Sequence, residues 1–227
     1  MNTDKTDVVD VSRSEIPNYG KMRLSKKLGS LLGDREDIMR RKLLAAVALK
    51  SVMKDWLRYC PGKPSLRSRI YNAFVKPVLL YNSSTWGISD TELKNLDSFH
   101  RKQLRVLNGL HWPKKINNSS LYKLSNSVPV SQDIIDGRWR LFGHVLRMDP
   151  SSPAYQAMEE YFLSDSPKFR GRPRTTLPVA LEHDLKHVGK TLKQCEDLDE
   201  LRWLAQNRRG WQTMVKKIVS CVARVGI

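Results

Sequence analysis

Helical periodicity dominates the chain from Asp34 onward. Between residues 34 and 57, apolar side chains recur at steps of three and four residues, the spacing that places them on one face of an α-helix. This apolar set consists of Ile38, Ala45, Ala48, Leu49, Val52 and Trp56. We therefore expect a helix here with Asp34 as its N-cap, and we expect the Pro- and Gly-containing segment Cys60–Pro64 to break it.

Two more helices follow. The first is predicted from about Leu66 towards Tyr81, and Pro77 should end or kink it because proline lacks the N–H that continues the hydrogen-bond ladder. The next should begin at Ser89, which forms a capping box with the glutamate three residues later, and should stop at Asn108-Gly109. Together with the preceding helix, these two predict a three-helix bundle.

The rest of the chain has weaker helical patterns. Residues 111–130 are expected to be loop-rich, Ser131–Met148 to be a helix, and the Pro- and Arg-rich residues 164–178 to be extended. Short helices should close the chain near 178–188, 197–206 and 209–222. We expect a mainly α fold.

Three segments follow from these patterns. Residues 1–33 contain two short runs that predict β-strands separated by a turn, too few to form an independent sheet. Residues 34–110 form the predicted bundle. Residues 111–227 form a basic helical extension with an Arg-Gly-Arg-Pro linker near 168–178.

The charge balance points to a polyanionic partner. The chain has 40 Lys and Arg against 23 Asp and Glu, a net charge of +17 and a pI near 10.0. Such a surface is best matched by a phosphate backbone. We expect no membrane association, because no apolar run is long enough to span a bilayer and the N-terminus is not a signal peptide. Three widely separated cysteines favour a reducing compartment, the cytoplasm or the nucleus.

Catalytic and metal-binding patterns are missing from the sequence. No closely spaced cysteines, phosphate-binding glycine loop or nucleophile motif occurs. His183 and His187 would share a helix face, but two histidines supply only half of a tetrahedral zinc shell, so we interpret them as a surface pair. Two-metal polymerase or nuclease chemistry needs clustered carboxylates, and the sequence has no Asp-Asp pair. We therefore predict no catalytic residues, no metal and no cofactor for this chain alone.

Basic residues beside tryptophans carry the candidate chemistry. Lys and Arg bind phosphates, and an adjacent tryptophan can stack on bases. We predict Trp56, Trp86 and Trp203 to be core residues and leave Trp112 open between the two roles. The predicted nucleic-acid-binding residues are Arg101, Lys102, Arg105, Trp112, Lys114, Lys115, Arg138, Arg140, Arg147, Lys168, Arg170, Arg172, Arg174, Arg208 and Arg209.

The Arg170–Pro173 tetrapeptide resembles the core of an AT-hook. Its glycine allows a close approach of the backbone to a narrow groove, while the arginines reach phosphates or the groove floor. The alternative is an exposed basic linker without a partner.

Six motifs occur in a fixed order along nearly the whole chain: Asn2–Thr6, Lys27–Ser30, Pro77–Trp86, Arg140–Met148, Arg170–Arg174 and Asn207–Trp211. In their order they resemble the motifs of reverse transcriptases from LINE-type (non-LTR) retrotransposons. The resemblance implies that residues 1–33 are the end of a palm sheet, that the bundle is a thumb, and that the remainder grips nucleic acid. It covers only the part after the catalytic Asp pair.

The resemblance also implies what this chain binds. Lys5 matches a palm-motif lysine but lacks its catalytic partners, and the Mg²⁺ ligands of the parent enzyme are absent. The expected ligands are RNA, an RNA–DNA hybrid or duplex DNA, bound without polymerisation. Three other interpretations stay open: a host-used DNA-binding or interaction module that recognises AT-rich DNA, a subunit whose partner chain supplies the palm, and a relic that does not fold cleanly because its palm edge is exposed.

Overall fold

Helices make up most of the described chain, which confirms the predicted mainly α fold. The computed structural model describes residues 26–57, 64–163, 175–186, 188–190, 192 and 195–225. This part of the chain forms two compact units, one within Met1–Pro61 and Arg69–Tyr81, the other within Gly62–Ser68 and Asn82–Ile227. Helix 90–107 therefore belongs with the C-terminal helices, so the division falls near Asn82 instead of at the predicted residue 110.

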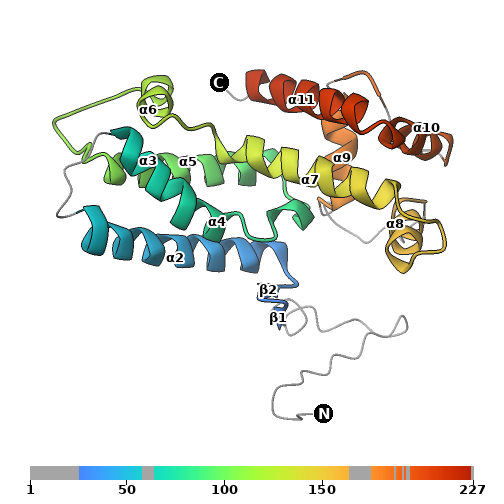
Figure 1. The fold of residues 1–227 in the computed structure, drawn as a ribbon, viewed down its shortest axis with the longest axis horizontal. Coiled ribbons are helices and arrows are strands. Elements are labelled where there is room, and N and C mark those ends of the chain that lie inside the picture. Colours follow the sequence, from blue (N-terminus) through green and yellow to red (C-terminus); the bar gives the residue numbers. More distant parts are fainter. Residues whose placement is uncertain are drawn as a thin grey trace, which may run out of the picture. The chain divides into compact units, whose positions relative to one another are not determined.

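The first unit is built on one long helix. Its elements are the hairpin strands β1 (Lys26–Lys27) and β2 (Ser30–Leu31), α2 (Asp34–Val52), the π-helix η2 (Met53–Leu57), the later part of α3 (Pro64–Phe74), and α4 (Lys76–Leu79). The strands are antiparallel, and α4 packs along α2 (Figure 1). One of the two predicted strands, over residues 26–32, instead folds back on itself as this hairpin, because Leu28 and Gly29 form a turn within it. The other predicted strand lies outside the described residues.

The start of α2 differs by one residue from the prediction. Gly33, in an extended conformation, is the N-cap, and its carbonyl accepts the Asp37 N–H at 2.8 Å. Asp34 is the first helical residue, so it does not cap the helix with its side chain. It joins Glu36 and Asp37 in the first turn, where carboxylates are favoured by the helix dipole.

The prediction that Trp56 is a core residue is wrong. Its side chain is 55% exposed and packs against Phe74, with ring centroids 5.4 Å apart. The cause is the π-helical turn at the end of α2, which takes more residues per turn than an α-helix. Buried Val52 is therefore followed by buried Leu57, five residues later, and Trp56 rotates outward.

Pro77 interrupts the second predicted helix, as expected. Helix α3 ends at Phe74 and α4 starts at Lys76, with Pro77 in its first turn. Proline has no N–H to donate to the preceding turn, so the α3 ladder cannot run through it. The interruption gives a short separate helix whose buried Leu79 faces the core of the first unit.

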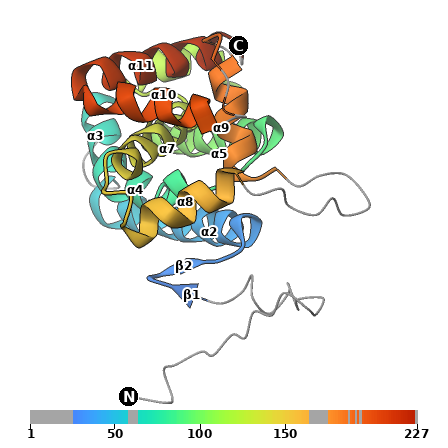
Figure 2. The same cartoon turned by 90° about the vertical axis from the view of Figure 1, so that its right-hand side faces the viewer.

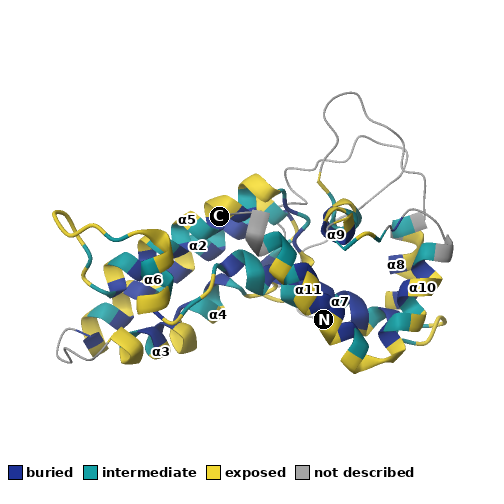
Figure 3. Ribbon diagram, turned by 90° about the horizontal axis from the view of Figure 1, so that it is seen from above, coloured by how far each residue is buried: buried dark blue, intermediate teal, exposed yellow. Residues whose placement is uncertain are grey.

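The second unit is organised around α7. Its elements are η3 (Ser83–Thr85), α5 (Asp90–Leu107), α6 (Asn118–Leu124), α7 (Val130–Leu146), α8 (Pro153–Leu163), α9 (Leu177–Lys186), α10 (Cys195–Gln206) and α11 (Arg208–Val225). Helices α5, α8, α10 and α11 all contact α7, and α10 and α11 also contact each other (Figure 2). Helix α7 is accordingly rich in buried positions (Figure 3).

Aromatic packing joins α7 to α11. The Trp139 and Trp211 ring centroids are 5.9 Å apart, and Phe142 lies edge-on to Trp139 at 5.7 Å. Trp211 Nε1 donates to the Trp139 carbonyl at 3.1 Å. Gly143 faces this cluster, and a methyl group there would overlap the Trp211 indole. The glycine is therefore required by the close approach of the two helices.

The capping box of α5 is confirmed. The Glu92 carboxylate accepts the backbone N–H of Ser89 at 3.0 Å, and the helix ends at Asn108 followed by Gly109 with φ +63°. The predicted helix over Ser131–Met148 is confirmed within two residues at each end.

Two predictions in this unit are wrong. Residues 111–130 contain α6, which begins after Asn117, whose side chain accepts the Ser120 N–H at 2.7 Å. Trp203, predicted to be a core residue, is 77% exposed. It follows buried Leu201 by two positions, about 200° around the helix, and therefore faces away from the α10 contact surface. Trp86, by contrast, is buried as predicted, at 1% exposed.

No helix in the described ranges is long and apolar enough to cross a membrane.

Candidate nucleic-acid interface

A continuous stretch of the second unit carries positive charge with no acidic residue. Residues 98–132 contain six Lys and Arg and no Asp or Glu. These six cations belong to α5, α6 and the loop between them. We call them the α5–α6 basic surface: Arg101, Lys102, Arg105, Lys114, Lys115 and Lys123. Sequence reasoning selected five of them. It missed Lys123 because it treated residues 111–130 as loop-rich.

Helix α5 orients its part of this surface through its own amphipathic pattern. Leu96, Leu104 and Leu107 are buried, which leaves Lys102 exposed and Arg101 and Arg105 half-buried. Both guanidinium groups are engaged by the protein, that of Arg105 with Asn118 and that of Arg101 with Tyr122. The bundle therefore fixes the direction in which these cations point.

Arg105 links α5 to α6. Its Nη2 donates to Asn118 Oδ1 at 2.8 Å, which connects the last turns of one helix to the start of the next. Tyr122 of α6 lies against His100 of α5, with ring centroids 6.0 Å apart. Burial raises the pKa of the Tyr122 hydroxyl, while the neighbouring Arg101 guanidinium opposes that increase. The hydroxyl therefore stays neutral and removes no positive charge from this surface.

The loop between α5 and α6 displays its side chains to solvent. The Leu110 N–H donates to the Arg105 carbonyl at 2.9 Å, and the Lys114 N–H donates to the His111 carbonyl at 2.9 Å. The second bond closes a turn with Trp112 and Pro113 at its corner. Trp112 is 84% exposed, and Lys114 and Lys115 are exposed beside it.

A second basic group lies where α7 ends and α11 begins. Arg147 Nη1 donates to the Ala205 carbonyl at 3.3 Å, and Arg208 and Arg209 are exposed. Partial burial, followed by the positive charge of Arg208, lowers the pKa of the Arg147 guanidinium. The two arginines are thus close enough to repel, and a bound anion would relieve that repulsion. Arg140 is also exposed, but it is paired with Asp136 at 2.8 Å.

Arg138 does not belong to any interface. The prediction placed it among surface cations, yet its side chain is 2% exposed. It donates to the Asp184 carboxylate at 3.4 Å and to the Trp86 carbonyl at 3.3 Å. The reason is its place on the face of α7 that buries Ile134 and Ile135. Arg138 therefore joins α7 to α9 and cannot contact a phosphate.

The Asp184 carboxylate completes this buried contact. It accepts Trp139 Nε1 at 3.0 Å in addition to the arginine. Burial raises the pKa of Asp184, and the positive charge of Arg138 opposes that increase. Trp139 and Trp211 are both buried, so neither can stack on a base.

His187 of the predicted histidine pair lies outside the described part of the chain, and so do five residues of the palm-like and Arg-Gly-Arg-Pro motifs. They are Lys5, Lys168, Arg170, Arg172 and Arg174. Their roles, including the AT-hook-like contact, stay predictions.

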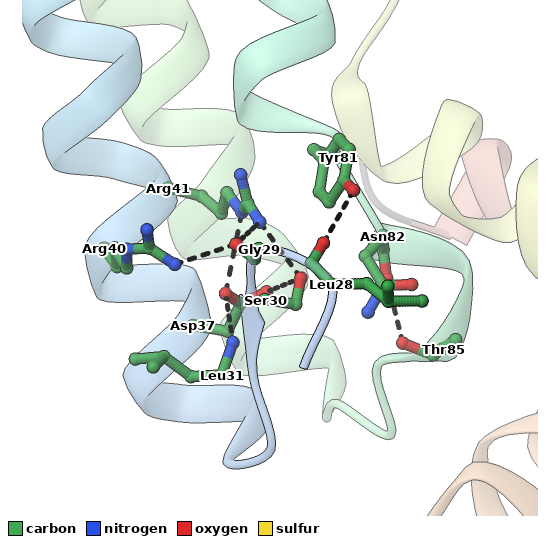
Figure 4. A network of polar contacts seen from close by, with 10 residues as sticks. All are labelled: Leu28, Gly29, Ser30, Leu31, Asp37, Arg40, Arg41, Tyr81, Asn82 and Thr85. Carbon is green, nitrogen blue, oxygen red and sulfur yellow. Dashed lines mark hydrogen bonds and ion pairs between the residues drawn. The ribbon is translucent and has the colours of Figure 1, made fainter. Parts of the chain in front are cut away.

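The first unit holds the Leu28-Gly29 turn in a network of polar contacts (Figure 4). Leu28 and Gly29 both have positive φ, 49° and 82°, as a tight two-residue hairpin requires. The Gly29 carbonyl accepts Arg40 Nη1 at 2.8 Å and Arg41 Nη2 at 2.6 Å, and the Leu28 carbonyl accepts the Tyr81 hydroxyl at 2.8 Å. The turn is therefore held rigidly against α2.

A buried carboxylate supports the same turn. Asp37 accepts the Leu31 N–H at 3.0 Å and the Ser30 hydroxyl at 3.2 Å, and its carboxylate lies 3.5 Å from Arg41 Nε. Sequence reasoning missed this network. The available signal was the i, i+4 spacing of Asp37 and Arg41 on a helix directly after the hairpin.

Among the described residues, no group of three or more His, Cys, Asp or Glu side chains is arranged to hold a metal ion. No family model, curated protein or solved structure matches the chain.

Proposed function

We propose that this chain is a nucleic-acid-binding C-terminal portion of a LINE-type reverse transcriptase, which binds through the α5–α6 basic surface and does not polymerise DNA alone. The observation that carries the proposal is the acid-free stretch 98–132, whose six cations lie on one helix pair and its loop. Motif order along the chain supports the family. A role for the chain inside the cell, in the nucleus or the cytoplasm, follows from such a ligand.

The carboxylate of Asp97, which borders the stretch, bonds to the start of α7. Asp97 accepts both the backbone N–H of Ser131, at 3.0 Å, and its hydroxyl, at 2.7 Å. These bonds hold Asp97 at the start of α7. The six cations outnumber this carboxylate and can attract a phosphate backbone, which releases counter-ions when it binds.

Arg147, Arg208 and Arg209 supply a second group of contacts in the same unit. Because Arg147 and Arg208 repel each other, a phosphate between them gains more than it would from a single isolated arginine. We propose that this group extends the binding surface beyond α5 and α6.

The test is fluorescence-anisotropy binding of the full chain to single-stranded RNA, an RNA–DNA hybrid and AT-rich duplex DNA over a salt series. Each phosphate neutralised on a duplex contributes about 0.9 to the slope of log K against log salt. The double variant Lys114→Ala/Lys115→Ala should therefore lower that slope by about 2 units. Lys50→Ala/Lys54→Ala, which removes the same charge from exposed positions of the first unit, is the matched control.

Three outcomes would contradict the proposal. Weak binding to every ligand would mean that the charge is only a solvated surface. An AT-duplex preference that is lost in Arg170→Ala/Arg172→Ala, but not in the lysine variant, would favour the host-used DNA-binding module. Primer extension by the purified chain would show that it polymerises without a partner.

A further inference from the structure

Trp112 is the most exposed of the described tryptophans. Trp86, Trp139 and Trp211 are buried, and Trp56 packs on Phe74. Trp112, 84% exposed, stands at the corner of the turn closed by the Lys114 N–H and the His111 carbonyl. Leaving so large an aromatic ring in water forfeits the burial that usually stabilises it.

The surroundings of Trp112 are those of a phosphate-binding surface. Lys114 and Lys115 follow it directly and are exposed, and Arg105 is bonded to both ends of the loop: its carbonyl accepts the Leu110 N–H and its guanidinium reaches Asn118. No carboxylate occurs within 14 residues before Trp112 or within 20 residues after it. A flat aromatic face is thus placed beside cations, with no carboxylate near it along the chain.

Trp203 provides the contrast within the same unit. It is similarly exposed, at 77%, but Asp199 and Glu200 precede it by four and three positions on α10. Residues at these spacings are neighbours on a helix surface. Glu200 is paired with Lys190, and the Asp199 carboxylate would repel a phosphate there. Exposure alone therefore does not distinguish the two tryptophans, whereas their charge surroundings do.

We infer that Trp112 is a stacking platform for an unpaired nucleobase, with Lys114 and Lys115 binding the flanking phosphates. This inference rests on the proposed function and names its ligand class: single-stranded RNA or DNA. Unpaired bases have free faces that an aromatic ring can cover, whereas bases inside a duplex are already stacked on their neighbours. Trp112 makes the α5–α6 basic surface favour single strands over duplexes.

The experiment measures binding of the full chain to oligo(dT), oligo(rU), a duplex and an abasic oligonucleotide of the same length and charge. Stacking on one base contributes about fivefold to about 150-fold in affinity. Trp112→Ala should lose that factor on oligo(dT) or oligo(rU), and nothing on the abasic strand or the duplex. Trp112→Phe should retain most of the affinity, and Trp203→Ala should behave as the wild type.

The stacking inference and the proposed function can be refuted separately. If Trp112→Ala binds oligo(dT) and oligo(rU) as tightly as the wild type while Lys114→Ala/Lys115→Ala weakens binding, the stacking inference is overturned and the proposed function stands. If Trp112→Ala loses equal affinity for the abasic strand, Trp112 supports the loop and does not stack. If the wild type binds none of the ligands, both are overturned. A loss confined to oligo(rU) or to oligo(dT) assigns the platform to RNA or to DNA.

Discussion

Gly143 of α7 offers a direct test of the packing between α7 and α11. A Cβ atom at this position would lie 2.2 Å from Trp211 Nε1 and 2.5 Å from its Cε2, far inside van der Waals contact. The indole is 3% exposed and donates to the Trp139 carbonyl, so it cannot move aside without breaking that bond. Gly143→Ala should therefore push α11 away from α7.

The expected loss of stability is the sum of one stabilising and two destabilising contributions. Alanine stabilises a helix interior by about 1 kcal/mol relative to glycine. Overpacking costs about 1 to 3 kcal/mol, and leaving the buried Trp211 N–H without its acceptor costs about 1 to 3 kcal/mol. The free energy of unfolding should therefore fall by about 1 to 5 kcal/mol, despite the better helix propensity of alanine.

Urea unfolding followed by circular dichroism measures this loss. Gly137, on the same helix, is the matched control, because its added Cβ would meet only Ser84 Cβ at 3.7 Å, an ordinary contact. Gly137→Ala should be neutral or stabilising by up to about 1 kcal/mol. Trp211→Leu in the Gly143→Ala background should cost less than the sum of the two single changes. If Gly143→Ala is as stable as Gly137→Ala, the reasoning is refuted.

Two other predictions concern buried carboxylates. Asp37→Ala deprives the buried Arg41 of its carboxylate and should lower the free energy of unfolding by about 3 to 5 kcal/mol, whereas Arg40→Ala should cost about 1 kcal/mol in the same urea titration. Equal losses would contradict the role given to Asp37. Because burial raises the pKa of Asp184, the folded state binds its proton more tightly than the unfolded chain. The contribution of Asp184 to the free energy of unfolding should fall as pH rises from 3.8 through the raised pKa of the folded state. Asp184→Asn should remove this pH-dependent contribution from unfolding curves measured at a series of pH values. An unchanged pH profile would oppose this reading.

Local signals in the sequence predicted the helices well. Ser89 and Glu92 located the start of α5, and Pro77 located the break between α3 and α4, because these effects act within one helical turn. The same local reasoning failed at Trp56, where the π-turn changes the helical period, and at α6, where the short helix is supported by Asn117 and by contacts with α5.

The same difference between local and distant effects applies to the residues of the candidate interface. Lys102, Lys114 and Lys115 could be predicted as exposed because charged side chains seldom lose their hydration. Arg138 could not be distinguished from them, because its burial depends on Asp184, 46 residues away, and on the Trp86 carbonyl. The sequence shows which residues are cations, but contacts with residues far away along the chain determine which of those cations are buried.

The sequence by itself therefore determined the mainly helical fold, the basic character and the acid-free stretch 98–132. These depend on residue type and on spacing within a few turns. Only the tertiary structure decided that Trp112 faces solvent while Trp139 and Trp211 do not, and that Gly143 must be a glycine. Those outcomes depend on which helix packs against which face, and packing is set by contacts between residues far apart in the chain.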